Sequence, residues 1–216
     1  MPYPLNYKDV KKYKKTKLCL GIKFICFNKD IIVKKKIIKT IPKNLLIALS
    51  GNSKKRITIR ILKSILKTTQ NLKIKVINDN LSNEIGDGLS NGKSITYLNN
   101  KHNINNLLDW SDIAILGEGL LRFEASVKGI PNIFINNIEN NKFNMKLIKD
   151  YLSYKSSIFF KCQNFDQSKF INKFQELFTN HQLRKNLSKN GLKYFDAEGH
   201  KRIYKEIEKI YFSHFS

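Results

Sequence analysis

The sequence has few of the residues that mark exported or metal-binding proteins. Its 216 residues include only three cysteines, at wide spacings that fit neither a disulfide framework nor paired metal-ligand motifs: Cys19, Cys26 and Cys162. The four histidines are scattered as well, without the spacing of a zinc site. We therefore expect no metal and no cofactor, and the cysteine usage favours a reducing, cytoplasmic location.

Long apolar runs are also missing. No window approaches the roughly 20 apolar residues of a membrane-spanning helix, and the best run, Leu45 to Leu49, has the length of a strand. The basic stretch from Met1 to Lys17 lacks the apolar core of a secretory signal. These absences predict a soluble protein with no integral membrane segment.

Acidic residues are scarce relative to basic ones. Forty Lys and Arg against seventeen Asp and Glu give a net charge of +23, which raises nucleic acid or an anionic membrane as a partner. The lysines are, however, spread along the chain among many Asn and Ile, as composition drift at tolerant surface positions would leave them. The densest cluster, Lys8 to Lys17, is either a solvated arm or a contact for an anionic membrane or polymer. Drift is the favoured explanation, and nucleic acid is not the expected partner.

From Lys43 onward, short apolar strands alternate with helical segments, which is typical of an α/β domain with a mostly parallel sheet. We expect one Rossmann-like lobe over 43–216 with a helical C-terminus, and a basic extension over 1–42 in which 21–27 can form a strand. In the lobe, strands are predicted at 45–49, 73–77, 94–98, 113–116, after Pro131 and at 156–160, and helices near 57–66, 103–110, 120–128, 140–152, 170–178, 181–195 and 199–211.

Two predicted strands run directly into glycine loops. Ser50-Gly51-Asn52-Ser53 follows the strand at 45–49, and Gly117-Glu118-Gly119 follows the strand at 113–116. Glycines let the backbone approach a ligand closely, and the start of a following helix favours phosphate. Open α/β sheets bind ligands at the carboxyl ends of such strands, so the two loops predict an anion-binding site.

The order of these motifs resembles a known family. Ser111-Asp112 precedes the second loop, Glu124 lies in the helix after it, and Gly129-Ile130-Pro131 ends that helix. This order is similar to the C-terminal lobe of the nucleotide-sugar hydrolases of pseudaminic acid synthesis and of the related spore-coat polysaccharide glycosyltransferase-like proteins, which share the two-lobed GT-B architecture. The resemblance covers roughly residues 20 to 211 and includes the closing segments at 183–191 and 199–203.

The resemblance implies roles for individual residues of a UDP-sugar site. Gly51 and Asn52 would approach the phosphate or base, Gly117 and Gly119 the diphosphate, and Glu124 the ribose hydroxyls. A carboxylate at the position of Glu124 can accept two vicinal hydroxyl donors.

The predicted site set also includes Glu118 and Leu120, where the chain departs from its relatives. Those proteins usually have Gly-Gly followed by Ser and Thr, whereas here Glu118-Gly119 is followed by Leu120 and Leu121. The hydroxyl donors are therefore missing, and a carboxylate beside a diphosphate is repulsive. Arg122 is the nearby charge that could offset this repulsion.

The implied function is a UDP-sugar-binding lobe of a hydrolase or glycosyltransferase in surface polysaccharide or nonulosonic acid synthesis. In the family the catalytic histidine belongs to the N-terminal lobe, and nothing before Lys43 resembles that lobe except its tail. We therefore predict no catalytic residue in this chain and a separately encoded N-terminal lobe as partner. Two alternatives remain open: a non-catalytic basic module that binds nucleic acid or an anionic polymer, and an inactive partner subunit of a complete enzyme.

Overall fold

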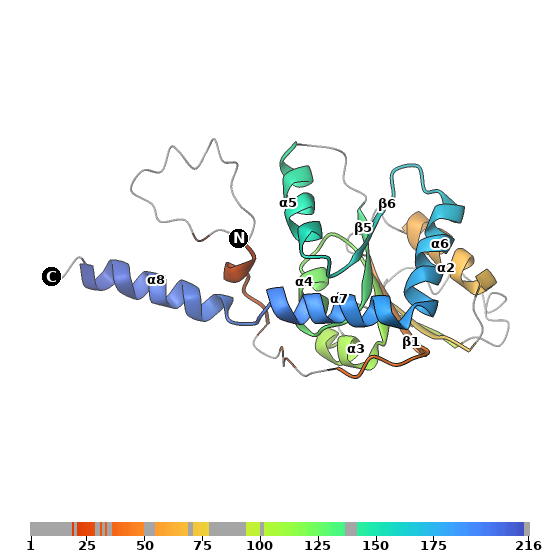
Figure 1. Cartoon of the computed structure of the whole chain (residues 1–216), viewed down its shortest axis with the longest axis horizontal. Helices are drawn as coiled ribbons and strands as arrows, with labels where there is room; N and C mark the ends of the chain where they lie inside the picture. The colour runs from red at the N-terminus through yellow and green to blue at the C-terminus, as the bar shows by residue number, and fades with distance from the viewer. Residues whose placement is uncertain are drawn as a thin grey trace.

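Six strands form one sheet in the order β3-β2-β1-β4-β5-β6, and every neighbouring pair is parallel (Figure 1). The computed structural model describes residues 19, 21–28, 31, 33, 36–49, 55–68, 71–77, 94–99, 102–136 and 142–213. The strands are β1 Asn44–Ala48, β2 Lys73–Ile77, β3 Ile95–Leu98, β4 Ile113–Leu116, β5 Asn132–Asn136 and β6 Ile158–Lys161. The predicted Rossmann-like lobe is thereby confirmed.

Helices cover both faces of the sheet, because alternate residues of each strand point to opposite sides. Leu45 and Ile47 of β1 pack in the cluster that contains the apolar sides of α2 and α6, whereas Leu46 and Ala48 pack with α3 and α4. Strands buried on both faces read as nearly continuous apolar runs, which is why they were visible in the sequence. The helices are α2 Lys55–Thr68, α3 Ile104–Trp110, α4 Leu121–Val127, α5 Lys142–Ser153, α6 Gln167–Thr179, α7 His181–Tyr194 and α8 Gly199–Ser213.

Local signals define the ends of the helices on either side of β4. Asn103 caps α3, because its side-chain oxygen accepts from the backbone nitrogens of Asn105 at 2.9 Å and Asn106 at 3.3 Å. After α4 the chain turns at Gly129, whose φ of 65° favours glycine. Pro131 then leads into β5. The helix predicted near 103–110 and the helix end predicted at Gly129-Ile130-Pro131 are thus both confirmed.

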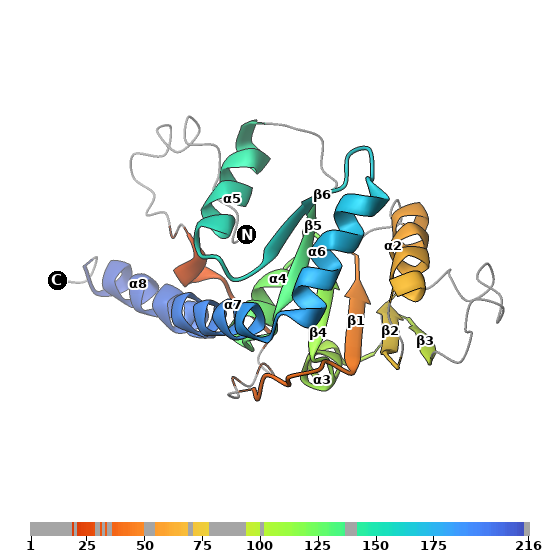
Figure 2. The same cartoon turned by 45° about the vertical axis from the view of Figure 1, so that its right-hand side comes forward.

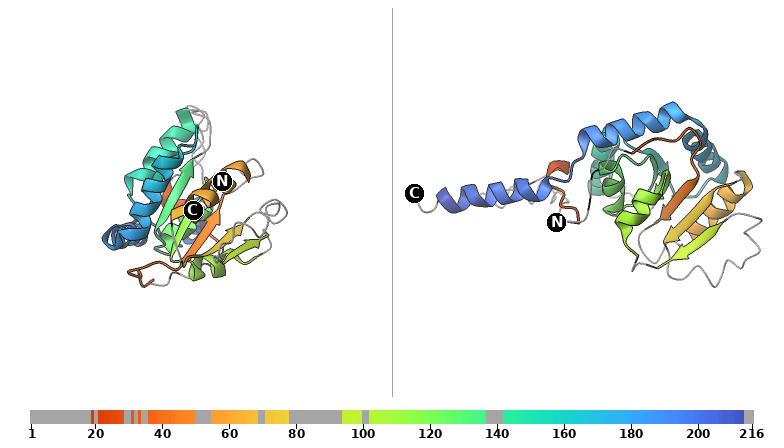
Figure 3. Two further views of the ribbon diagram at one scale, coloured as in Figure 1. Left: turned by 90° about the vertical axis from the view of Figure 1, so that its right-hand side faces the viewer. Right: turned by 90° about the horizontal axis from the view of Figure 1, so that it is seen from below.

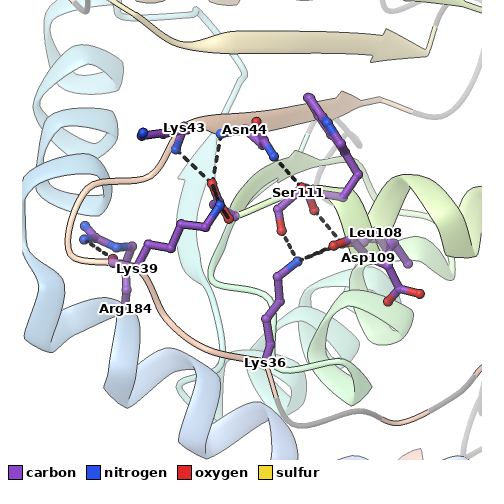
Figure 4. Close-up of polar contacts among 10 residues, drawn as sticks. Lys36, Lys39, Lys43, Asn44, Leu108, Asp109, Ser111 and Arg184 are labelled. Atoms are coloured by element: carbon purple, nitrogen blue, oxygen red, sulfur yellow. Dashed lines mark hydrogen bonds and ion pairs between the residues drawn. The ribbon is translucent and has the colours of Figure 1, made fainter.

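Basic side chains fasten residues 36–43 to the amino edge of the sheet (Figure 4). Asp112, just before β4, accepts hydrogen bonds from the backbone nitrogens of Lys43 at 2.9 Å and Asn44 at 3.1 Å, and it pairs with Lys39. The Lys36 ammonium donates to three backbone carbonyls around the end of α3, those of Leu108, Asp109 and Ser111. Burial lowers the pKa of Lys36 to about 8, against the opposing effect of Asp112 and Asp109.

Arg184 of α7 holds the same segment from the other side. Its side chain is buried, and its guanidinium donates to Leu177 O at 2.8 Å and Phe178 O at 2.6 Å at the end of α6. It also donates to Lys39 O at 3.0 Å and Thr40 O at 2.6 Å. One buried cation therefore joins two helices to the segment that leads into β1.

Residues 21–27 do not form the strand that their composition suggested. The structure has a single 3-10 turn, η1, at Ile22–Phe24, after Gly21 at a φ of 93°. This segment lies against α8 and not beside an edge strand of the sheet, and Arg202 of α8 donates to Lys23 O at 2.9 Å. The prediction of a strand was wrong because apolar content alone does not supply a neighbouring strand with which to pair.

The last helix, α8, projects away from the sheet beyond η1 (Figures 2 and 3). Half of the ten exposed large hydrophobic side chains of the described residues lie on it. Four of them recur at helical spacing and, with the half-buried Ile203, define what we call the α8 apolar stripe: Ile203, Tyr204, Ile207, Ile210 and Tyr211. Within the described part of the chain, no helix combines the length and apolar character that a bilayer span requires.

Candidate functional site

The strand order reverses between β1 and β4, and the candidate site lies at the carboxyl ends of these two strands. From β1 the chain moves outward to β2 and β3, and then returns to the other side of β1 to build β4, β5 and β6. Crossover connections diverge at this point, and ligands of open α/β sheets bind in the resulting crevice. Gly117 lies directly at it, because its backbone nitrogen donates to Ala48 O at 3.0 Å across the two strand ends.

Glu118 is held by groups on two different elements. Its Oε1 accepts a hydrogen bond from Nδ2 of Asn136, the last residue of β5, at 3.2 Å. Its backbone carbonyl accepts from Nη1 of Arg122 at 2.7 Å. The loop after β4 is therefore fastened both to β5 and to the first turn of α4.

The guanidinium of Arg122 is surrounded by aromatic rings. Its side chain is buried, and its guanidinium carbon lies 4.6 Å from the ring centroids of both Phe123 and Phe134 and 5.2 Å from that of Tyr151. These cation–π contacts stabilise a charge that has left water. The positive charge is thus built into the wall beside the loop, where it contacts the backbone carbonyl of Glu118. That it offsets the Glu118 carboxylate stays a prediction.

Glu124 occupies the first turn of α4 and is half-buried. Burial raises the pKa of its carboxyl group, and the nearby Lys128 acts in the opposite direction. Within the described residues, its carboxylate makes no hydrogen bond or ion pair. A desolvated carboxylate beside the loop retains its acceptor capacity for hydroxyl donors of a ligand.

Gly119 and Leu120 complete the turn between β4 and α4. Leu120 is the N-cap residue of α4 and provides no side-chain capping hydrogen bond, and its side chain is 37% exposed. The rim of the loop is therefore apolar where relatives of the predicted family carry hydroxyl groups. The other predicted loop, with Gly51 and Asn52, lies outside the described residues.

Among the described residues, no cluster of three or more His, Cys, Asp and Glu side chains could hold a metal ion. Two of the three histidines that the structure describes contact oxygen atoms of the protein. Nε2 of His181 lies 2.9 Å from Ile38 O, and Nδ1 of His102 lies 2.8 Å from Oδ1 of Asn99.

Asn136 is the site residue that the sequence analysis missed. It stands at the carboxyl end of β5, next to β4 in the sheet, and polar residues at the ends of neighbouring parallel strands meet at one edge. Its place at the end of a predicted strand was the signal that could have identified Asn136 as a site residue. It could be used only once β5 was known to lie beside β4.

Comparison with known proteins supports the fold. No protein-family model matches the sequence, and no curated protein matches it. Among solved structures, MurG of Acinetobacter baumannii superposes with a TM-score of 0.70 at 15% identity, over 95% of this chain and 64% of that protein. UDP-GlcNAc 2-epimerase of Neisseria meningitidis, solved with UDP-GlcNAc, superposes with a TM-score of 0.60 at 18% identity, over 80% of this chain and 45% of that protein.

A glycosyltransferase of Rickettsia africae gives a TM-score of 0.56 at 17% identity over 77% of this chain and 47% of that protein. The chain therefore spans about two thirds of the length of MurG and about half of the length of the other two. At these identities the likeness establishes the fold, which is one Rossmann-like lobe of the GT-B type.

Proposed function

We propose that this chain binds a nucleotide sugar, with UDP-sugars as the first candidates, at the carboxyl edge of β1 and β4. The observation that carries the proposal is the half-buried carboxylate of Glu124 beside the strand reversal. The superposition on an epimerase solved with UDP-GlcNAc supports the ligand class. In this role the carboxylate of Glu124 accepts hydrogen bonds from the two ribose hydroxyls. Gly117 and Gly119 leave space for the diphosphate.

Isothermal titration of the full chain with UDP and UDP-GlcNAc tests this proposal. We expect binding in the micromolar to millimolar range, and a loss of about ten-fold or more in affinity for Glu124→Ala, because charge-assisted hydrogen bonds are removed. Glu176→Ala, which removes an exposed carboxylate of α6, is the matched control. If no heat of binding is detected at millimolar ligand, the proposal is contradicted. An equal loss of affinity in Glu124→Ala and in the control would contradict it as well.

Gly51 and Asn52 are proposed to contact the phosphate or base, on the resemblance alone. Gly51→Ala and Asn52→Ala are the corresponding variants. We expect either one to weaken UDP binding without changing the thermal unfolding midpoint. Unchanged affinity in both would remove this loop from the site.

The proposed activity is that of one lobe of a hydrolase or glycosyltransferase in surface polysaccharide or nonulosonic acid synthesis, completed by a lobe from a separate chain. This chain covers 64% of MurG and 45% of the epimerase, so those two proteins contain further structure outside the matched lobe. The α8 apolar stripe supports an additional lobe, because isolated helices of this length are marginal in water and gain stability from packing of an apolar face.

Co-expression with the products of neighbouring reading frames, followed by size-exclusion chromatography and an assay of UDP-GlcNAc turnover, tests for this lobe. We expect the chain alone to bind ligand without turnover, and a complex to turn it over. Ile207→Lys should prevent complex formation while leaving UDP binding unchanged, because Ile207 is far exposed on α8. Full turnover by the chain alone contradicts the need for a second lobe, and a complex that adds no turnover favours an inactive partner subunit.

A further inference from the structure

The outer side of α2 carries only positive charge. The exposed residues of α2 are all basic, and we call them the α2 basic row: Arg56, Arg60, Lys63 and Lys67. The helix contains no acidic residue. Within the described residues, none of the four side chains makes an ion pair or a hydrogen bond.

The four side chains form a straight line. Their spacings of four, three and four residues place them on one side of the helix, and eleven residues of helix extend over about 16 Å. The opposite side of α2 is fixed in the core by Ile61, Leu62 and Ile65. In addition, α2 packs beside α6 at the outside of the lobe (Figure 2). The four side chains of the α2 basic row are exposed, so the row faces solvent.

The surrounding sequence adds no compensating charge. Between residues 31 and 78 there are thirteen Lys and Arg and no Asp or Glu. Lys73, which opens β2 shortly after α2 ends, is also exposed. The positive potential of the row is therefore reinforced from the same part of the chain.

Composition drift does not explain the α2 basic row well. On α7 the three exposed lysines are mixed with other residue types, as drift at tolerant positions would leave them: Lys185, Lys189 and Lys193 stand beside Gln182, Asn186 and Tyr194. On α2 no neutral polar residue occupies an exposed position. The row is thus a distinct surface feature and not a sample of the average surface.

We propose that the α2 basic row binds the headgroups of an anionic lipid bilayer. A straight row on a rigid, convex helix can touch a flat charged surface with all four side chains at once. The row has no aromatic side chain to stack on bases and no amide or hydroxyl group to read base edges, which disfavours nucleic acid. No apolar residue accompanies the charges outward, so the association is electrostatic, reversible and sensitive to salt.

This inference does not depend on nucleotide-sugar binding. The α2 basic row lies on the helix that follows β1, so association with a bilayer would hold the carboxyl edge of the sheet near the membrane surface. A basic side chain near an anionic membrane increases partitioning by about five-fold. With four such side chains we expect substantial binding of the chain to an anionic membrane at low salt and little binding at high salt.

The test is co-sedimentation of the full chain with vesicles of phosphatidylcholine alone or with about one quarter phosphatidylserine, at low and at near-physiological salt. The test variant is Arg56→Glu, Arg60→Glu, Lys63→Glu and Lys67→Glu combined. The matched control reverses four exposed lysines elsewhere, namely Lys149, Lys161, Lys185 and Lys189, and so has the same net charge. A second variant with Gln at all four positions removes the positive charges without adding negative ones, in case the charge reversal prevents folding. Circular dichroism and thermal melting show whether every variant is folded.

We expect binding to the anionic vesicles only, a loss of about a hundred-fold or more in the test variant, and a much smaller loss in the control. Equal losses in the two charge-reversed proteins would show that net charge alone acts, and would overturn the proposal. Absence of binding to anionic vesicles would overturn it as well. Tighter binding of a short DNA duplex than of vesicles at the same salt, lost in the test variant, would reassign the row to nucleic acid.

Discussion

Asn136 at the end of β5 holds the carboxylate of Glu118 through a hydrogen bond of 3.2 Å. The carboxylate is therefore directed along the carboxyl edge of the sheet toward β5, next to the strand ends where the ligand is proposed to bind. The hydrogen bond to Asn136 favours this position of the negative charge, close to where a diphosphate is proposed to bind.

Glu118→Gln should strengthen UDP binding. The change removes the negative charge but keeps an oxygen that can accept from Asn136. For charges several ångströms apart in a partly solvated crevice the gain is roughly 0.5–1 kcal/mol, or about two- to five-fold in Kd. Titration calorimetry at low and high salt measures it, and the gain should shrink with salt. Weaker binding in the variant would show instead that the carboxylate contacts the ligand favourably.

Binding of UDP-GlcNAc should weaken at acidic pH through Glu124. Burial raises the pKa of this carboxyl group above its usual range, so protonation, which removes an acceptor, occurs at a higher pH than for an exposed glutamate. Kd values of the native protein and Glu124→Gln, measured between about pH 5 and pH 7.5, should converge as the pH falls. A constant ratio of the two Kd values over this range would contradict the role of Glu124.

Deprotonation of Lys36 should increase the free energy of unfolding as the pH rises above neutrality. The pKa of Lys36 is about 8 in the folded chain and 10.5 without the fold. Between these values the unfolded chain binds a proton that the folded chain does not, so the free energy of unfolding rises with pH. Lys36→Met, which keeps the length of the side chain, should lack this increment. Urea unfolding of both proteins at about pH 7 and pH 9.5 isolates the difference, and parallel pH profiles would refute it.

Arg184→Met should destabilise the lobe strongly. The guanidinium donates to four backbone carbonyls from a site that is 1% exposed. Leaving these buried acceptors without a donor costs roughly 3 kcal/mol. Lys185→Met at the exposed neighbouring position is the control and should change the free energy of unfolding by less than about 0.5 kcal/mol. A small effect of Arg184→Met would mean that the 36–43 segment gains its order from elsewhere.

Much of the fold could be predicted from the sequence because the local signals agree with the tertiary structure. The apolar runs of β1 and β4 are buried on both faces, Asn103 caps α3, and Gly129 and Pro131 end α4 where expected. The strand expected at 21–27 was wrong, since no sheet edge lies beside it.

The contacts of individual basic residues were beyond prediction. Arg184 and Lys36 each satisfy backbone carbonyls of distant segments, yet in the sequence they cannot be distinguished from the many basic residues on the surface. The same holds for Asn136, whose importance depends on β5 lying beside β4. Such contacts connect residues far apart in the chain, and neither periodicity nor spacing encodes them.

The close packing of Gly199 on the backbone of Ile25 has a further consequence. A side chain at position 199 would collide with the Ile25 carbonyl, so η1 and the start of α8 touch directly. Two segments far apart in the sequence, residues 22–25 and the start of α8, therefore adjoin. Domains whose ends adjoin in this way tolerate insertion into a host loop and circular permutation.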